Sequence, residues 1–348
     1  MKVSQILCAA GPVDAVTNQA LSWRAELEGW GWDGNVFSAR AAQDMSRRDI
    51  RPLRELEPDA DILLLHYSGY GRDLEPVFDA SARTLLLYHN VTPEEWFWPY
   101  EPVEAVVCKL GRGQLRELAT VADQLAGVSQ YNAAELKEVT GRDAAVIPVL
   151  FDPGRLGSPG PAERPGPPTV LFVGRLAPHK RQDLVIRAFA RFLRRRPDAR
   201  LVLVGTPLSP AYGRELERLA EQLAPGAVTF ESYLSSQELA ERYRSAHVLL
   251  CLSEHEGFCI PLLEAFHFGL PVVARNAAAV GEVVGDAGVL LDPEDGLGTV
   301  AELLDIVVGD PELRAELRSR GQARLARFDR AETTQVMKNT LSALAGWA

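Results

Sequence analysis

Two basic side chains follow an apolar run in the second half of the chain. Arg175 comes directly after Gly174, which ends the run 170–173. Lys180 lies five residues further on, just before a helical pattern over 182–195. A helix start carries partial positive charge and unpaired backbone N–H groups, so two cations beside it are suited to holding a diphosphate. The alternative is that both are ordinary solvated surface cations, and charge alone favours neither interpretation.

Two carboxylates follow a later apolar run. Glu256 lies in a loop after the run 248–252, and Glu264 follows one turn inside a helix that we expect to begin near Pro261. Carboxylates are suited to paired hydrogen bonds with the vicinal hydroxyls of a sugar or a ribose. The residues 257–260 would present backbone N–H groups ahead of this helix. Loop and helix carboxylates also occur without any ligand, which is the alternative.

Polar residues also follow the apolar runs of the first half. They are Gly11, Asp14, His66, His89 and Asn90. In a parallel sheet the carboxyl ends of the strands collect at one edge, where ligands bind. We therefore expect these residues to lie beside a ligand, although a histidine at such a place can equally be a buried structural residue.

Short apolar runs alternate with helical patterns throughout the chain, which predicts parallel sheets covered on both faces. A stretch rich in Pro and Gly interrupts the pattern once and has no periodicity, so it is interpreted as a linker. We expect two doubly wound α/β domains that face a cleft, where ligands bind. The expected boundaries are an N-terminal domain over 1–151, the linker over 152–168, a C-terminal domain over 169–330, and a helix over 331–348 that packs back on the N-terminal domain.

Cofactor and metal motifs are missing. The sequence contains neither G-x-G-x-x-G after the first strand nor a P-loop. The four cysteines lie in or beside apolar runs without zinc spacing, which predicts reduced, buried thiols. Asp59 and Asp61 resemble the D-x-D metal pair of some sugar transferases, but they precede an apolar strand and are typical of a strand entrance. We expect no metal and no bound cofactor.

The charge is uneven between the two halves. The chain has a net charge of −10, with 14 basic and 22 acidic side chains in residues 1–150 and 23 basic and 25 acidic in the remainder. This excess of acid argues against a nucleic-acid partner. No apolar run is long enough to span a membrane. We expect a cytoplasmic protein that contacts the inner face of a membrane loosely at most, since the first half is too acidic to favour anionic lipid.

A set of motifs in the second half, taken in order, resembles the donor domain of family 4 glycosyltransferases. The matching residues are Gly174, Arg175, Lys180, Gly205, Glu256, Pro261, Glu264, Gly269, Pro271 and Glu282. These enzymes have the GT-B fold and retain the anomeric configuration of the donor sugar. Two positions depart from the family pattern, because Cys259 and Ser232 stand where the family usually has glycine.

The resemblance implies a role for each matched residue. Gly174, Arg175 and Lys180 would hold the diphosphate of a nucleotide sugar, and Glu264 would bind the ribose. The transferred sugar would be bound by Glu256 and by the backbone of Gly257, Phe258, Cys259 and Ile260. The loops after 204 and 230, with Gly205, Tyr233 and Leu234, would surround the nucleobase.

The first half resembles, less specifically, a bacterial subgroup of hexosyl- and mannosyltransferases that build surface polysaccharides. This likeness rests on the sequence around His89, on 111–115 and on 129–136. It implies that His89 lies near the transferred sugar and acts in catalysis with Glu256, Arg175 and Lys180. The acceptor side would comprise Gly11, Asp14, His66, Asn90 and Trp96. Trp96 belongs to an aromatic cluster over 96–100 that could stack on a sugar, enter a membrane interface or form a small core.

The sequence thus favours a retaining, metal-independent glycosyltransferase. It would move a hexose of the mannose or glucose type from a UDP- or GDP-linked donor to a saccharide or lipid-linked acceptor. The alternatives are a nucleotide-sugar epimerase or hydrolase of the same fold, and a sugar-binding protein without catalysis.

Overall fold

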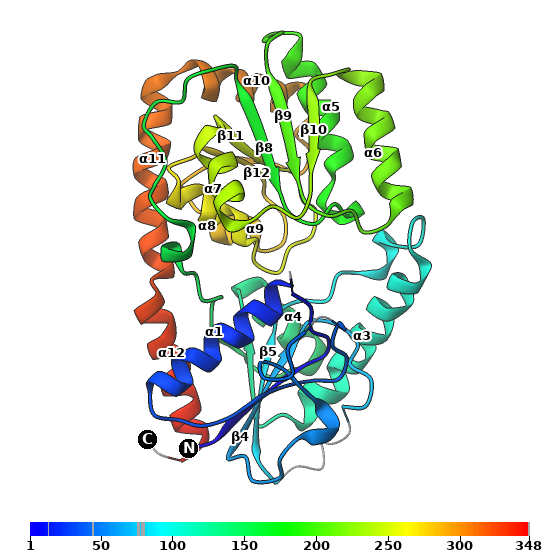
Figure 1. Ribbon diagram of the computed structural model, residues 1–348, viewed down its shortest axis with the longest axis vertical. Helices are drawn as coiled ribbons and strands as arrows, with labels where there is room; N and C mark the ends of the chain where they lie inside the picture. Colours follow the sequence, from blue (N-terminus) through cyan, green and yellow to red (C-terminus); the bar gives the residue numbers. More distant parts are fainter. Residues whose placement is uncertain (13, 44, 75–76, 78–80, 347–348) are drawn as a thin grey trace. The chain divides into compact units, whose positions relative to one another are not determined.

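The computed structural model describes residues 1–348 apart from 13, 44, 75–76, 78–80 and 347–348. The chain divides into two compact units (Figure 1). The first comprises Met1–Glu95, Pro102–Leu150 and Arg330–Ala348, and the second comprises Trp96–Glu101 and Phe151–Asp329. Each unit is built around one sheet whose strand pairs are all parallel.

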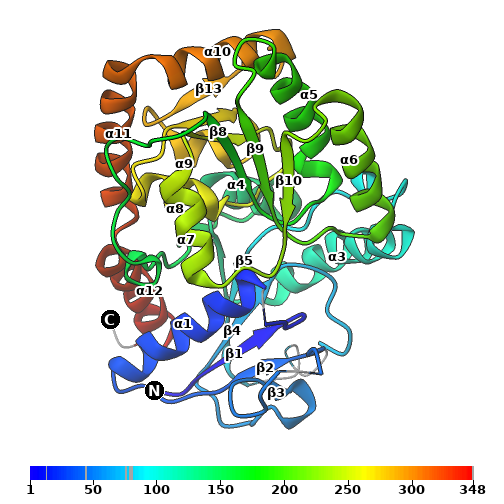
Figure 2. The same ribbon diagram turned by 45° about the horizontal axis from the view of Figure 1, so that its top comes forward.

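The first unit has a sheet in the order β3-β2-β1-β4-β5-β6-β7 (Figure 2). Its strands are β1 (Val3–Leu7), β2 (Val36–Ser38), β3 (Arg51–Pro52), β4 (Ile62–Tyr67), β5 (Arg83–Tyr88), β6 (Gln124–Gly127) and β7 (Ala145–Val146). Its described helices include α1 (Ala15–Gly29), α3 (Pro102–Val121), α4 (Gln130–Thr140) and α12 (Arg330–Leu344). Every residue of β1 and β4 is buried, because helices cover both faces of a parallel sheet.

The second unit has a sheet in the order β10-β9-β8-β11-β12-β13. Its strands are β8 (Thr169–Val173), β9 (Arg200–Val204), β10 (Val228–Glu231), β11 (Val248–Cys251), β12 (Val272–Arg275) and β13 (Val289–Leu291). Its helices are α5 (Gln182–Leu193), α6 (Pro210–Leu223), α7 (Ser236–Ser245), α8 (Ile260–His267), α9 (Val280–Val284), α10 (Leu297–Gly309) and α11 (Pro311–Leu325). Short 3₁₀ turns occur at Pro153–Leu156 and Pro178–Lys180.

The strand order fixes where ligands can be held. In each sheet the chain first adds strands on one side of the first strand and then returns to add strands on its other side. The loops that follow the two central strands therefore run in opposite directions and diverge. This switch point lies between β1 and β4 in the first unit and between β8 and β11 in the second. The loops that carry Arg175 and Glu256 follow β8 and β11, so the topology of the second unit brings the two motifs together.

The stretch interpreted as a linker is counted with the second unit and is bonded to it by two arginine side chains. The Arg244 side chain donates to the carbonyl oxygens of Leu156 and Ser158, and Arg318 donates to those of Gly160 and Pro161. These guanidinium groups satisfy a backbone that has no regular secondary structure of its own for most of its length. The stretch is therefore held in place by side chains from α7 and α11.

The segment Trp96–Glu101 interrupts the first unit in sequence and belongs to the second. Phe97 is buried and makes an edge-on contact with His179, with the ring centroids 5.6 Å apart. Tyr100 packs in the same way on Tyr212 at 4.8 Å and donates a hydrogen bond to Glu215. Part of the aromatic cluster is therefore a small core. Trp96 itself, which we expected on the acceptor side, is placed with this second unit.

Candidate functional site

The loops after β8 and β9 each begin with a glycine of positive φ. Gly174 has a φ of +145° and Gly205, at the end of β9, a φ of +156°. A Cβ atom on Gly205 would lie 1.9 Å from the carbonyl oxygen of Gly174, so no other residue fits without moving the backbone. This close approach places Arg175 at the edge of the sheet, where its side chain is exposed.

Lys180 and Glu256 form a largely buried ion pair. The Lys180 Nζ and Glu256 Oε1 atoms are 2.6 Å apart, with side-chain exposures of 17% and 10%. Ser253 donates its hydroxyl to the same carboxylate oxygen at 2.8 Å. Burial lowers the pKa of Lys180, whereas its neighbours, above all the Glu256 carboxylate, raise it, and the net result is a pKa above the ordinary value. The lysine is therefore a fixed positive charge at neutral pH.

Two further cations near this loop are already neutralised. Arg181 pairs with Asp183 and Glu254, and Arg275 donates to the same Glu254 oxygen at 3.0 Å. Arg175 differs from them, because no carboxylate of the described residues lies within ion-pair distance of it. An exposed, unpaired guanidinium beside a fixed ammonium is the feature of this site that fits an anionic ligand.

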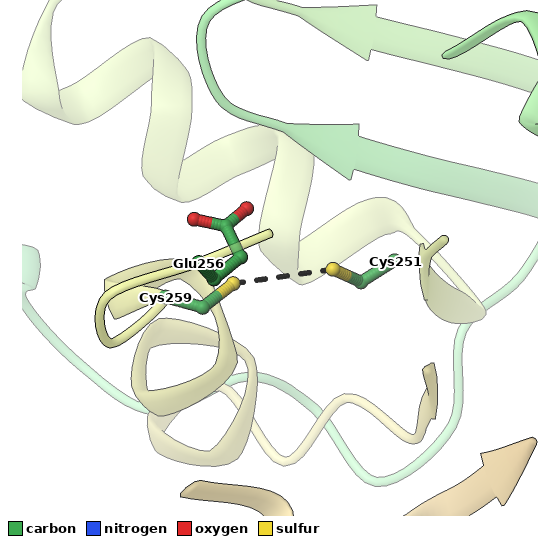
Figure 3. A group of neighbouring side chains, drawn as sticks. All are labelled: Cys251, Glu256 and Cys259. Carbon is green, nitrogen blue, oxygen red and sulfur yellow. Dashed lines mark hydrogen bonds between the residues drawn. The ribbon is translucent and has the colours of Figure 1, made fainter. Parts of the chain in front are cut away.

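Two thiols lie beside Glu256 (Figure 3). The sulfur atoms of Cys251 and Cys259 face each other at 4.0 Å, and the Glu256 side chain lies beside Cys259. These three side chains could offer ligands to a metal ion, since their donor atoms lie within 4.8 Å of one another. The cation that faces the carboxylate, however, is the ammonium of Lys180. A metal ion bound through Glu256 would lie close to this ammonium, and the two positive charges would repel each other.

Cys259 occupies a strained backbone position. Its φ of +76° lies in the left-handed region, which favours glycine. This residue is the N-cap of α8, and its side chain makes no capping hydrogen bond. The first-turn N–H groups of α8 therefore have no side-chain cap, which leaves them suited to a ligand. Phe258 is buried with its ring against Phe328, so only its backbone is suited to meeting a sugar.

Glu264 is held by a tyrosine that the motifs do not include. The Tyr243 hydroxyl donates to Glu264 Oε2 at 2.5 Å, and its ring stacks on Phe268. Burial raises the pKa of Glu264, while the hydrogen bond from Tyr243 acts in the opposite direction. The tyrosine fixes one carboxylate oxygen, so the other is the one suited to a ribose hydroxyl. Tyr243 comes from α7, and nothing in its local sequence distinguishes it from a core residue.

The expected nucleobase residues line the ends of β9 and β10. Ser232 donates its hydroxyl to the carbonyl oxygen of Gly205 at 3.1 Å, which ties the two loops together. Tyr233 is 82% exposed and has a φ of +58°, and Leu234 is half-buried. An exposed aromatic ring held on a constrained backbone offers a surface for stacking on a base.

The first unit gathers two of its expected residues at one sheet edge. His66, at the end of β4, is fully buried, and its Nδ1 lies 3.0 Å from Nε2 of the half-buried His89. The opposite nitrogen of His66 lies 2.8 Å from Oε1 of Gln5 on β1. Sequence reasoning did not select Gln5, although a glutamine within the mostly apolar run 3–7 was a usable signal.

The other expected acceptor residues make structural contacts. The side chain of Asn90, which is 9% exposed, donates to Asn132 and Glu135. Asp14 is the N-cap of α1 and accepts from the backbone and hydroxyl of Thr17, whose hydroxyl also accepts from the Gly11 N–H. These bonds hold the backbone of the loop after β1. The role of this loop toward an acceptor stays a prediction.

Comparison with known proteins assigns a family to most of the second half of the chain. Residues 158–324 match the family model described as "Glycosyl transferases group 1". This part of the chain is a group 1 glycosyltransferase domain. It contains each of the donor-side residues discussed above, from Gly174 to Glu264.

A curated relative of the chain is also a glycosyltransferase. The chain is 34% identical over 237 residues to the D-inositol 3-phosphate glycosyltransferase of Acidothermus cellulolyticus. The match covers 61% of this chain and 51% of that protein. The matches span 51–61% of the length of the curated relatives compared.

Solved structures show the fold of the whole chain. Sucrose-phosphate synthase from Thermosynechococcus elongatus superposes with a TM-score of 0.79 at 18% identity, covering all of both chains. HepE from Anabaena, solved with UDP-glucose, superposes with a TM-score of 0.74 at 20% identity, covering 99% of this chain and 100% of that one. The group 1 glycosyltransferase domain is therefore part of a GT-B fold, as the resemblance in sequence implied.

Proposed function

We propose that the protein is a retaining glycosyltransferase that uses a nucleotide-diphosphate hexose as donor. The observation that carries this proposal is the unpaired Arg175 beside the Lys180–Glu256 pair, at the switch point of a group 1 glycosyltransferase domain. Arg175, Lys180 and the uncapped start of α8 would receive the diphosphate. Glu264 would hold the ribose and Glu256 a hydroxyl of the transferred sugar.

The reaction needs stabilisation of charge rather than a nucleophile from the protein. As the bond between the sugar and the diphosphate breaks, the electron pair passes to the phosphate oxygen, and the sugar becomes oxocarbenium-like. Arg175 and Lys180 would stabilise the growing negative charge in a fixed geometry. The acceptor hydroxyl attacks the same face and gives its proton to the leaving phosphate. We assign no metal to this step, because the two cations supply the positive charge.

The donor and acceptor are proposed at the level of chemical class. HepE was solved in complex with UDP-glucose, which supports a UDP-linked hexose, and a GDP-linked hexose is the other donor to test. The similarity to the Acidothermus D-inositol 3-phosphate glycosyltransferase supports a polyol or saccharide acceptor. His89 and the loop after β1 are proposed to serve the acceptor side.

Membrane contact would be peripheral and cytoplasmic. Among the described residues no helix is long and apolar enough to cross a membrane. The helix α3 exposes Val103, Val106 and Leu110, which lie three and four residues apart and so share one face. This stripe offers a lipid-linked acceptor an apolar surface on the first unit.

A donor screen tests the proposal. Turnover of UDP- and GDP-linked glucose and mannose is measured with and without added saccharide or polyol acceptors, and the anomeric configuration of each product is determined by NMR. Transfer with retained configuration supports the proposal, whereas inversion, acceptor-independent epimerisation or the absence of nucleotide binding overturns it. Arg175→Gln should lower turnover at least about 100-fold, as expected for a charge-stabilising group. Arg187→Gln is the matched control, because Arg187 is an exposed arginine on α5.

A further inference from the structure

A chain of buried hydrogen bonds runs across three adjacent strands of the first unit. Gln5 lies on β1, His66 on β4 and His89 directly after β5, and these strands are neighbours in the sheet. Gln5 and His66 are at most 1% exposed. The chain of bonds begins at the carbonyl oxygen of Ala20 in α1, which lies 3.0 Å from Nε2 of Gln5.

The carbonyl of Ala20 sets the direction of every bond that follows. A carbonyl oxygen only accepts, so the NH₂ group of the Gln5 amide must face it, and the amide oxygen must face His66. The His66 Nε2 atom therefore carries the proton of the 2.8 Å bond to Gln5. In a neutral ring Nδ1 of His66 is then the acceptor, and His89 must donate to it from Nε2 across 3.0 Å.

Burial keeps both rings neutral. It lowers the pKa of His66 well below its ordinary value, and it lowers the pKa of His89 to about 3. The His89 proton is thus committed to Nε2, and its Nδ1 is left as a hydrogen-bond acceptor. Among the described residues, no group donates to this Nδ1.

We propose that Gln5 and His66 are positioning residues that hold His89 as its neutral Nε2–H tautomer, so that Nδ1 accepts a hydrogen bond from a ligand hydroxyl. This inference rests on the proposed function for the identity of the ligand, which would be a hydroxyl of the sugar or of the acceptor. Neither Gln5 nor His66 touches the ligand. A histidine in the opposite tautomer would present a donor to the same hydroxyl and would exclude the hydroxyl's own proton from the bond.

The tautomer is measured directly by ¹⁵N NMR of the full chain labelled at histidine. The six histidines are few enough for the His89 signals to be assigned by loss in His89→Gln. At neutral pH we expect a protonated Nε2 and an unprotonated Nδ1 in the unmodified protein. A His89 that is protonated at Nδ1, or charged, overturns the proposal whether or not any variant folds.

The variant Gln5→Leu removes the amide oxygen that accepts from His66 and puts an apolar side chain of similar size in its place. We expect the His89 tautomers to become mixed. Gln19→Leu is the matched control, because Gln19 is also buried and bonds the backbone of Leu150 through both ends of its amide, but it does not reach the histidines. An unchanged His89 spectrum in folded Gln5→Leu, or an equal change in Gln19→Leu, overturns the proposal.

Activity provides a second measurement once a donor is known. Gln5→Leu should lower turnover about 10-fold, the size of one misdirected hydrogen bond, and Gln19→Leu should leave it unchanged. If no nucleotide sugar is turned over, the proposed function fails, while the ¹⁵N spectra still decide the tautomer. If transfer is found but Gln5→Leu loses the tautomer without losing turnover, the role assigned to His89 toward the ligand is wrong.

Discussion

Removing the charge of Lys180 should have separate effects on stability and on turnover. In Lys180→Met the Glu256 carboxylate remains in a site where only 10% of its side chain is exposed, without the ammonium 2.6 Å away. Breaking a buried pair by removing one partner costs about 3–5 kcal/mol of unfolding free energy. We expect the lower end, about 3 kcal/mol, because Ser253 still donates to the carboxylate. Turnover should fall at least about 100-fold.

The double variant Lys180→Met with Glu256→Gln separates the two effects. Removing both charges leaves no unpaired ion, so most of the lost stability should return. Turnover should stay low, because the cation proposed to stabilise the leaving diphosphate and the carboxylate proposed to bind the sugar are both absent. Urea titrations followed by circular dichroism give the free energies of unfolding, and the donor assay gives the turnover of each variant.

An exposed ion pair provides the control. Lys137 and Asp143 lie 2.8 Å apart but are 64% and 88% exposed, so Lys137→Met should change neither stability nor turnover measurably. If Lys180→Met costs no more stability than Lys137→Met, the buried pair does not have the expected energetics. If the double variant regains turnover together with stability, the loss in Lys180→Met reflects misfolding, and the assignment of Lys180 to the diphosphate is refuted.

Three further predictions concern other parts of the molecule. Burial lowers the pKa of His89 to about 3, so protons bind the unfolded chain more strongly than the folded one. The free energy of unfolding should therefore fall by about 2 kcal/mol as the pH is lowered from 6.5 to 5. Urea titrations at the two pH values should show a smaller loss in His89→Gln. Cys259→Gly should have a free energy of unfolding about 1 kcal/mol higher than that of Cys259→Ala, because both lose the sulfur but only glycine relieves the φ of +76°. Equal midpoints in urea would contradict this. Vesicle sedimentation should show weaker binding when Val106 and Leu110 are both changed to Ser, whereas the same changes should leave binding of a soluble donor intact.

The strands of both sheets were most predictable where they are fully apolar. The runs that became β4, β8 and β11 are rich in Val, Leu and Ile, and burial on both faces leaves few other structures for them. The short strands β2 and β3 were not predicted, because two or three residues carry no periodicity. The segment 96–101 was not predicted to join the second unit, because its aromatic residues find Tyr212 and His179 far away in sequence.

The site was predictable where spacing carries information. Arg175, Lys180, Glu256 and Glu264 stand at fixed intervals around strand ends and helix starts, which can be recognised from the sequence. Their partners could not be found in this way. Tyr243 approaches Glu264 from another helix, and Arg181 and Arg275 share the Glu254 carboxylate although the three residues come from separate parts of the chain.

The pairing pattern explains how an acidic chain can hold a polyanion. The net charge of −10 would repel a nucleotide diphosphate at long range, but such repulsion between exposed charges is screened beyond about 10 Å at ordinary salt. Close to the site, Arg181 and Arg275 already compensate nearby carboxylates, which leaves Arg175 as an exposed guanidinium without an acidic partner in the described chain. An incoming diphosphate would thus meet a cation that it need not take from another carboxylate, so the binding energy is not offset by breaking an ion pair. This asymmetry makes Arg175 a better test of donor binding than either of its paired neighbours.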